Sequence, residues 1–424
     1  MLALFLLGLF ALIIMGVPVA IALVGTAVLM MLAQGDMTTL KLAQSYIIGT
    51  DSVPLLAIPF FMLAGEIMNA GGISKRIVNF AKVLLGHFRG GLGYVGVLAS
   101  MIFAGISGSA VADTTAVGSV VLPIMGESGY KKEKSTALIC SAGCIGPIIP
   151  PSTQMIFYGV IAEVSIVKLF LGGIIPGILI GLGLMVMWYF HAKKENYPVG
   201  VRASFKELCI ATKESIWAIL LPGFIITCIV TGIATATETA ALAVVYALIV
   251  AVFIYKEMAI KEWVEIIIRA CRGTAVMMLV VGAANVAAYL ITTAQVPQLL
   301  ADTILSLTDN VYLFMLLVNV LLVLIGCVMD SGPAILIFAP ILLPIAKTFG
   351  LDPIYLGVIM VCNLCIGLAT PPVGNVLYVG VGLGKVRLID LIKNIWPFLV
   401  MMFAILFTIT YFPNLIMFIP RNFG

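Results

Sequence analysis

Two stretches of this chain interrupt segments that are otherwise apolar enough to be helical. Residues 140–153 (CSAGCIGPIIPPST) hold three prolines and two glycines, and residues 362–375 (CNLCIGLATPPVGN) repeat much of that pattern. A proline has no N–H donor and clashes with the carbonyl four residues earlier, so each stretch breaks its helix and frees carbonyl groups. A free carbonyl in hydrocarbon is costly unless something satisfies it, and a small cation does so directly. Each break is therefore a candidate cation site, and the alternative is a kinked helix whose carbonyls are met by Ser or Thr.

Asp330 is the acidic residue with the most unusual position, because it lies inside the apolar run VLIGCVMDSGPAILIF. An ionisable side chain at membrane depth is expensive and marks a pathway or an ion pair. Asp330 is therefore a candidate substrate ligand, and a structural salt bridge is the alternative. Glu66, Asp113 and Glu238 have weaker claims, and we predict that they are structural partners of Ser, Thr or Arg.

The elements that position these residues are membrane helices. The chain has 424 residues, of which 62% are hydrophobic and 10% charged, and no soluble domain of this size leaves so little polar surface. Apolar runs at 2–33, 168–190 and 396–418 are each long enough to cross a hydrocarbon core, which takes about 20 helical residues. The first run has no basic n-region, so we expect a retained helix rather than a cleaved signal peptide. The sequence thus predicts an all-α polytopic membrane protein.

The chain contains an internal repeat. Residues 221 positions apart are identical at many Gly and Pro positions, more often than chance explains. The agreeing pairs include Gly105 and Gly326, Gly129 and Gly350, Gly146 and Gly367, Pro151 and Pro372, and Pro176 and Pro397.

The two copies lie in opposite charge settings. Short cytoplasmic loops collect Lys and Arg, and the first copy has basic segments at 75–89 and 131–134, whereas the corresponding segments of the second copy, 295–310 and 351–354, have none. Opposite sidedness predicts an inverted repeat, the layout in which two equivalent halves of a secondary transporter support alternating access. In each copy we expect a re-entrant hairpin, with tips at 107–115 and 330–333, followed by the broken helix.

Other functions fit the sequence less well. Ser107 lies in a GISG motif that resembles the nucleophile of rhomboid-type intramembrane proteases, but this chemistry needs a histidine base, and His87 and His191 lie far along the chain. The chain has no GxxxxGK[ST] loop for an ATP-driven pump, and its eight cysteines lack zinc spacing, which predicts free buried thiols. We therefore expect no enzyme. A passive anion channel and, less favoured, an intramembrane serine protease stay as alternatives.

Long motifs over nearly the whole chain resemble the large membrane subunit of tripartite ATP-independent periplasmic (TRAP) transporters. They are FFMLAGEIMNAGGISKRIV, GGLGYVGVLASMIFAGISGSAVADTTAVGSVVLPIM, GPIIPPST, VMDSGPAILIFAPILLPI and DPIYLGVIMVCNLCIGLATPPVGNVLYV. The resemblance implies sodium-driven uptake of an organic acid anion, either a C4-dicarboxylate or a sugar acid such as sialic acid. It implies two protein partners, a periplasmic substrate-binding protein and a small four-helix membrane subunit, with no nucleic acid. It also implies the bacterial inner membrane and an elevator-type transport domain, as in the wider ion transporter superfamily.

The repeat and this resemblance together assign site residues. We predict that Ser107, Ser152 and Asp330 bind the substrate, because a hairpin tip that meets the break would bring the two serines together. Neutral oxygens suit Na⁺, the implied coupling ion. The predicted sodium ligands are Ser107 or Ser109 with the carbonyls of Gly146, Ile149 and Pro151 in the first copy, and Gly326 and the Thr370 hydroxyl with the carbonyls of Gly367, Thr370 and Pro372 in the second.

The chain is expected to divide into scaffold and transport parts. The parts are an N-terminal helix with scaffold and arm elements (1–90), the first hairpin and broken helix (91–167), scaffold helices with a cytoplasmic linker (168–310), the second hairpin and broken helix (311–385), and a C-terminal scaffold helix (386–424). Amphipathic segments at 74–88 and 257–271 are expected to lie along the membrane interface as arms.

Overall fold

The computed structural model describes residues 2–35, 39–258, 262–296, 298, 300 and 310–423. Helices dominate this part of the chain, with one isolated bridge between Arg89 and Val199. The helices up to the middle of the chain are α1 (Leu2–Ile14), α2 (Val19–Gln34), α3 (Thr39–Thr50), η1 (Val53–Leu56), α4 (Ala57–Ala70), α5 (Ile73–Leu85), α6 (Gly91–Ser107), α7 (Ala110–Glu127), α8 (Lys132–Gly143), α9 (Thr153–Ala162) and α10 (Ile166–Lys194). The later helices are α11 (Phe205–Val230), α12 (Ala236–Leu248), η2 (Ile249–Ile254), α13 (Trp263–Thr293), α15 (Val311–Gly326), α16 (Ser331–Thr348), α17 (Pro353–Gly367), α18 (Asn375–Gly384), α19 (Leu388–Tyr411) and α20 (Asn414–Phe423).

Two hairpins and two broken helices form the centre of the molecule. The first hairpin is α6 and α7, and α8 and α9 are the halves of the first broken helix; α15 to α18 repeat this order. The repeat is close, because α7 spans 110–127 and α16 spans 331–348, so that both ends lie 221 residues apart. The predicted hairpins and breaks are therefore confirmed. Seven helical segments in the described part of the chain are long and apolar enough to cross a membrane.

The helices that follow the breaks pack with this centre. α10 lies against α6, α17 and α19, and α19 also lies against α8. The sequence-based division assigned both helices to a scaffold, whereas their packing groups them with the hairpins, and we call α6 to α10 and α15 to α19 the central unit. Which parts move stays a prediction.

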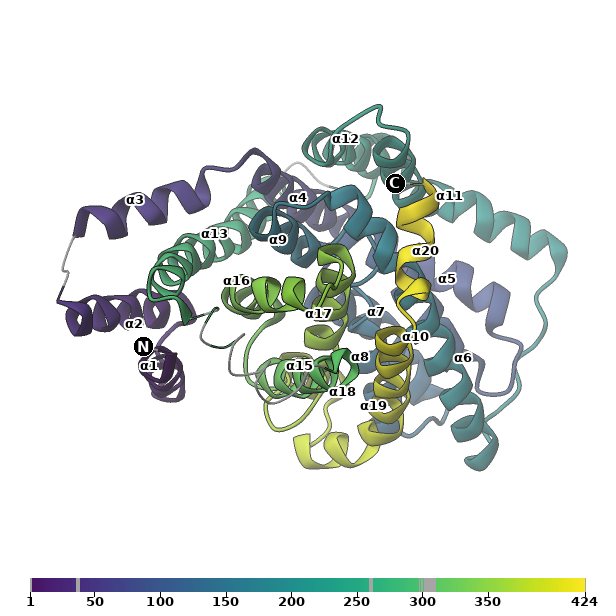
Figure 1. Cartoon of the computed structure of the whole chain (residues 1–424). Coiled ribbons are helices and arrows are strands. Elements are labelled where there is room, and N and C mark those ends of the chain that lie inside the picture. The colour runs from purple at the N-terminus through teal and green to yellow at the C-terminus, as the bar shows by residue number, and fades with distance from the viewer. Residues whose placement is uncertain are drawn as a thin grey trace.

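The remaining helices, which we call the outer helices, surround the central unit. α13 packs against α2, α3 and α4, α12 packs on α4, and α11 packs on α5. In Figure 1, α1, α2, α3 and α13 lie on one side of the hairpin helices α15 to α17, and α5 and α11 lie on the other. The central unit is thus held between two groups of outer helices.

Two apolar runs that we expected to form single helices are interrupted. The run at 2–33 divides into α1 and α2, because Gly16 has a left-handed φ of 84° and Pro18 cannot donate a helical hydrogen bond. The run at 396–418 divides into α19 and α20 on either side of Pro413. The prediction of one C-terminal scaffold helix is therefore wrong.

Both hairpin tips end earlier in the chain than expected. The first tip is residues 108–109, because Ser109 caps α7 by accepting a hydrogen bond from the Ala112 N–H. The second tip is residues 327–330, because Asp330 caps α16 through the Ser331 N–H. The predicted tips at 107–115 and 330–333 thus ran past the caps into the helices.

One of the two expected arms is present as a separate amphipathic helix. α5 buries Ile73, Ile77, Val78 and Ala81 on one face, as the first arm requires. The second arm is wrong as an element, because from Trp263 onward its residues belong to the long helix α13, while 259–261 lie outside the described residues. Most of the acidic segment 295–310 also lies outside them.

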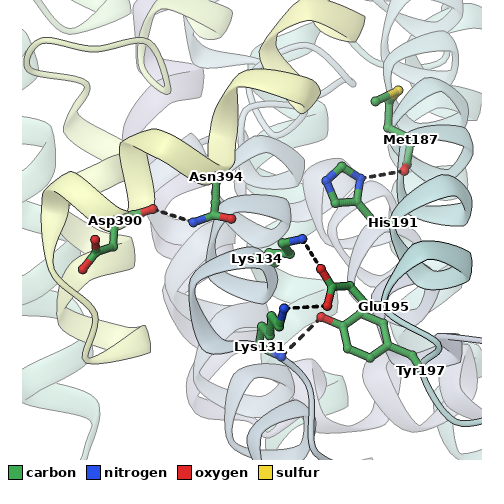
Figure 2. Close-up of polar contacts among 8 residues, drawn as sticks. All are labelled: Lys131, Lys134, Met187, His191, Glu195, Tyr197, Asp390 and Asn394. Atoms are coloured by element: carbon green, nitrogen blue, oxygen red, sulfur yellow. Dashed lines mark hydrogen bonds and ion pairs between the residues drawn. The ribbon is translucent and has the colours of Figure 1, made fainter.

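An ion-pair cluster joins the C-terminal end of α10 to the start of α8 (Figure 2). The Glu195 carboxylate lies 2.6 Å from Lys131 Nζ and 2.5 Å from Lys134 Nζ, and the Lys131 N–H donates to the Tyr197 hydroxyl at 3.3 Å. Hydrogen bonds from the two lysines lower the pKa of Glu195 to about 2, against an ordinary value of 4.5. The charged carboxylate therefore stabilises the folded state above pH 4.5, and this contribution is lost as the pH falls toward 2.

Glu195→Gln is expected to lower the melting temperature of the purified chain at pH 7. A partly exposed ion pair contributes about 1 kcal/mol or less, which corresponds to about 2 °C. Scanning calorimetry at several pH values is expected to show that the difference from wild type shrinks below pH 4.5. Glu133→Gln is the control, because Glu133 makes no ion pair within the described residues. An equal loss in both variants, or a loss that does not depend on pH, would contradict the assignment.

Candidate functional site

The first hairpin tip lies directly against the first break. The Thr153 hydroxyl donates to the Gly108 carbonyl at 3.5 Å, and a Cβ atom on Gly108 would lie only 2.5 Å from the Pro151 carbonyl oxygen. Gly108 also has a left-handed φ of 60°, so its backbone turn and this close approach both require glycine. The meeting of tip and break that the sequence predicts is therefore confirmed in the first copy.

Asp113 is buried beside this contact. Its side chain is 0% exposed, its Oδ1 accepts a hydrogen bond from the Ser107 hydroxyl, and its Oδ2 has no partner among the described residues. A Cβ atom on Gly146 would lie 2.3 Å from that Oδ2 and 3.1 Å from the Ser109 carbonyl oxygen. A buried carboxylate oxygen without a donor is expensive, so one that points at the break indicates a place for a cation.

The second tip meets the second break in the same way. The Gly374 N–H donates to the Cys327 carbonyl at 3.1 Å, and a Cβ atom on Gly367 would lie 2.6 Å from the Gly326 Cα atom. The Thr370 hydroxyl donates to the Ile366 carbonyl at 2.9 Å, which leaves its oxygen lone pairs available. The structure thus brings Gly326 and Gly367, two of the predicted ligands, into backbone contact.

Free carbonyls lie at both breaks. Among the hydrogen bonds of the described residues, none reaches the carbonyls of Gly146, Ile149 or Pro151. The carbonyls of Gly326, Thr370 and Pro372 are likewise without a donor in that part of the chain, whereas the Gly367 carbonyl accepts from the Thr370 N–H at 2.9 Å. Carbonyls without a donor are what a hard cation such as Na⁺ needs, since it prefers oxygen ligands. The residues present therefore fit the implied ion, although whether they bind it stays a prediction.

A separate cavity of about 370 Å³ contains Asp330. Its polar lining comes from Asp330, Gln154 and Arg272, and its apolar lining includes Phe157 and Leu336. Small-molecule pockets have volumes of about 300–1,000 Å³, mostly apolar walls and a few placed polar groups, so this cavity is a candidate substrate site.

The two serines predicted to bind substrate have other partners. Ser152 is 0% exposed, and its hydroxyl donates to the Pro147 carbonyl and caps α9 by accepting from the Met155 N–H at 3.2 Å. Ser107 donates to Asp113 and also accepts from the Ser109 N–H at 3.2 Å. The cavity around Asp330 includes neither serine. Their assignment to the substrate stays a prediction, and the contacts favour a role in shaping the first break.

Three residues of these sites were not predicted to be ligands. We expected Asp113 to be a structural partner, and Gln154 and Arg272 were not considered as ligands. For Asp113 the sequence holds a signal, because the residue lies four positions after the Ser109 cap and so one helical turn from the tip. No local pattern marks Gln154 or Arg272, since they meet Asp330 only through the packing of α9, α13 and α16.

Alternative chemistries gain no support from the side chains. All eight cysteines are free, as predicted, but Cys209 and Cys271 are exposed rather than buried. No three His, Cys, Asp or Glu side chains gather as a metal site within the described residues. The described contacts of Ser107 involve Ser109 and Asp113 rather than a histidine.

Comparisons with known proteins agree with this architecture. The sequence-family model for the DctM component of tripartite ATP-independent periplasmic transporters matches residues 6–415. A putative TRAP transporter large permease protein of Haemophilus influenzae is 46% identical over 405 residues, covering 96% of this chain and 95% of that protein. The 2,3-diketo-L-gulonate TRAP transporter large permease protein YiaN of Escherichia coli is 44% identical over 403 residues, covering 95% and 94%.

Among solved structures, the YdaH transporter of Alcanivorax borkumensis shares the fold. It superposes with a TM-score of 0.63 over 88% of this chain and 87% of that one, at 13% sequence identity. The fold likeness, the family model and the relatives lead to one conclusion: the chain belongs to the DctM family of TRAP transporter large permeases, multi-pass proteins of the inner membrane.

Proposed function

We propose that this large permease couples sodium entry to the uptake of an organic acid anion, either a C4-dicarboxylate or a sugar acid. A periplasmic substrate-binding protein delivers the anion, and a small four-helix membrane subunit supports the permease. The central unit moves against the outer helices as an elevator, which gives the bound anion access to each side in turn.

The observation that carries this proposal is the unpaired Oδ2 of Asp113, aimed at Gly146 in a break whose carbonyls are also free. A sodium ion there neutralises the carboxylate and supplies the partner that the carbonyls lack. The second break offers a similar set of free carbonyls around Thr370, and the hairpin tip beside it carries the Asp330 carboxylate. Two sites of this kind beside one anion cavity support the coupled transport of sodium and the anion in the same direction.

In each ion site, we assign a role to the residues of this chain. The carbonyls and Asp113 hold the ion, and the ion in turn draws the hairpin tip onto the break. Because the Gln154 amide donates to the Ser331 hydroxyl at 3.2 Å, the half-helix α9 of the first copy is tied to the second hairpin. Ion binding at the first break is therefore transmitted to the wall of the anion cavity through one hydrogen bond.

Uptake into sealed proteoliposomes tests the proposal. We expect accumulation of the anion only when the permease, its small subunit, the loaded binding protein and an inward sodium gradient are all present. Accumulation by the permease alone, or movement that follows the anion gradient without sodium, would contradict it. The second result would point to a passive channel.

A further inference from the structure

The cavity beside the second hairpin tip has charges of opposite sign on different helices. Asp330 is the N-cap of α16 in the central unit, whereas Arg272 belongs to α13, an outer helix. Arg272 lies nine residues into α13, which is about 14 Å along its axis at about 1.5 Å per residue. An arginine in a candidate membrane span, beside a cavity and without an ion-pair partner, indicates a substrate pathway.

Arg272 has no assigned partner. Arg272 is exposed and lines the cavity, and its side chain makes no ion pair or hydrogen bond within the described residues. Arg269, one turn earlier on the same helix, is held by Glu66 at 3.0 Å and by Glu265 at 2.9 Å. The contrast separates a structural arginine from one that is free to bind a ligand.

The part of the cavity lined by Asp330 presents a hydrogen-bond acceptor, which a ligand must meet with a donor. Asp330 Oδ1 accepts from the Ser331 N–H at 2.7 Å, and its Oδ2 accepts no hydrogen bond in the described part of the chain. An ionised carboxylate accepts hydrogen bonds and cannot donate them, so a hydroxyl suits it and a second carboxylate does not. Like charges brought together in an interface cost several kcal/mol.

Gln154 adds a fixed amide to the same wall. Its Nε2 donates to the Ser331 hydroxyl at 3.2 Å, and its Oε1 accepts from the Thr153 hydroxyl at 2.8 Å. These two bonds orient the amide and leave one Nε2 hydrogen for a ligand oxygen. The cavity thus offers a cation on one side, and an acceptor with a neutral donor on the other.

From this arrangement we infer that the permease takes a hydroxylated monocarboxylate, with the carboxylate on Arg272 and the hydroxyls on Asp330 and Gln154, and that it discriminates against dicarboxylates. The inference rests on the proposed transport function and narrows its substrate. Arginine binds a carboxylate through two parallel hydrogen bonds, which gives geometry as well as charge. Because Arg272 comes from an outer helix, it holds the anion only while the central unit lies beside α13.

Ligand binding to the full chain in lipid nanodiscs tests the inference. The probes are D-gluconate and D-glucuronate as hydroxylated monocarboxylates, succinate as a dicarboxylate, and sorbitol as a neutral polyol, each measured by calorimetry with sodium present. We expect at least one of the two sugar acids to bind, and succinate and sorbitol to bind far more weakly. Equal binding of succinate, or binding of neither sugar acid, would overturn the inference.

Four variants test which residues cause the selectivity. Arg272→Gln is expected to raise the Kd of the sugar acid by roughly 10- to 100-fold, as for loss of a charged hydrogen-bond partner, and Arg272→Lys to restore part of it. Arg269→Gln is the matched control and is expected to keep the Kd. Asp330→Asn keeps a capping side chain and removes the repulsion, so it is expected to improve succinate binding relative to the sugar acid.

The inference and the transport proposal fail in different ways. Sugar-acid binding that depends on Arg272 but not on sodium would overturn the sodium coupling and leave the inference standing. Sodium-coupled uptake that Arg272→Gln leaves unchanged would overturn the inference alone.

Discussion

Asp113→Asn is expected to raise the sodium concentration for half-maximal uptake by about 10- to 100-fold or more. The substitution keeps an oxygen for the Ser107 hydroxyl but removes the negative charge that faces Gly146. A charged ligand lost from a buried site weakens binding by about 1.5–3 kcal/mol at the least, and by more where nothing else balances the ion. Sodium titration of uptake in proteoliposomes measures the shift.

Thermal unfolding supplies a second measurement for Asp113. A ligand that binds only the folded state adds about 2.7 kcal/mol of stability at 100 times its Kd, so wild type is expected to melt at a higher temperature in sodium than in potassium. Asp113→Asn is expected to lose this difference. The control is Asp390→Asn, because Asp390 pairs with Arg387 at 2.7 Å at the start of α19 and belongs to neither break. If Asp113→Asn has a lower melting temperature in both salts but still melts at a higher temperature in sodium than in potassium, Asp113 has only a structural role.

Gly367→Ala is expected to reduce uptake by about tenfold or more. Its new Cβ atom would lie 2.6 Å from the Gly326 Cα atom and 2.7 Å from the Gly326 carbonyl carbon. Both neighbours are backbone atoms, so α15 has to move away from α17 and carry the Gly326 carbonyl with it. Overpacking of this kind costs about 1–3 kcal/mol and displaces a proposed ligand at the same time.

Gly382→Ala is the control for this change. Gly382 lies on α18, the other half of the same broken helix, and a Cβ atom there would meet nothing within 4 Å. Alanine in an exposed helix is favoured over glycine by about 1 kcal/mol, so this variant is expected to transport normally and to melt no earlier than wild type. Normal uptake by Gly367→Ala would mean that the contact between tip and break is dispensable.

The parts of the fold that were predicted correctly follow from local rules. Proline pairs break helices wherever they occur, and the offset of 221 residues carried the prediction from one half to the other. The errors arose where a cap or a turn decides a boundary. The hairpin tip was extended to 115 because small polar residues follow Ser109, but that serine caps α7, and the helix continues through Thr114 and Thr115 as each hydroxyl donates to the carbonyl four residues earlier.

The site was harder to predict than the fold, because it is made by contacts between distant segments. Ser152 was assigned to the substrate from its nearness to the break, but a serine after a proline pair is also the ordinary cap of the next half-helix, and the structure uses it so. Arg272 directly follows the segment that we expected to be the second arm, and charge along the sequence does not show which helix face a residue lies on. Its position beside Asp330 appears only after α13 is packed on α16.

The two copies differ at the positions that carry charge, although α7 and α16 have equal bounds 221 residues apart. Asp113 of the first copy corresponds to Ala334 of the second, and Ser109 corresponds to Asp330. If both breaks bind sodium, the carboxylate beside the first is Asp113, one turn inside α7, and the carboxylate beside the second is Asp330, which caps α16 and also lines the anion cavity. The second sodium site would then share its carboxylate with the anion site, whereas the first would not.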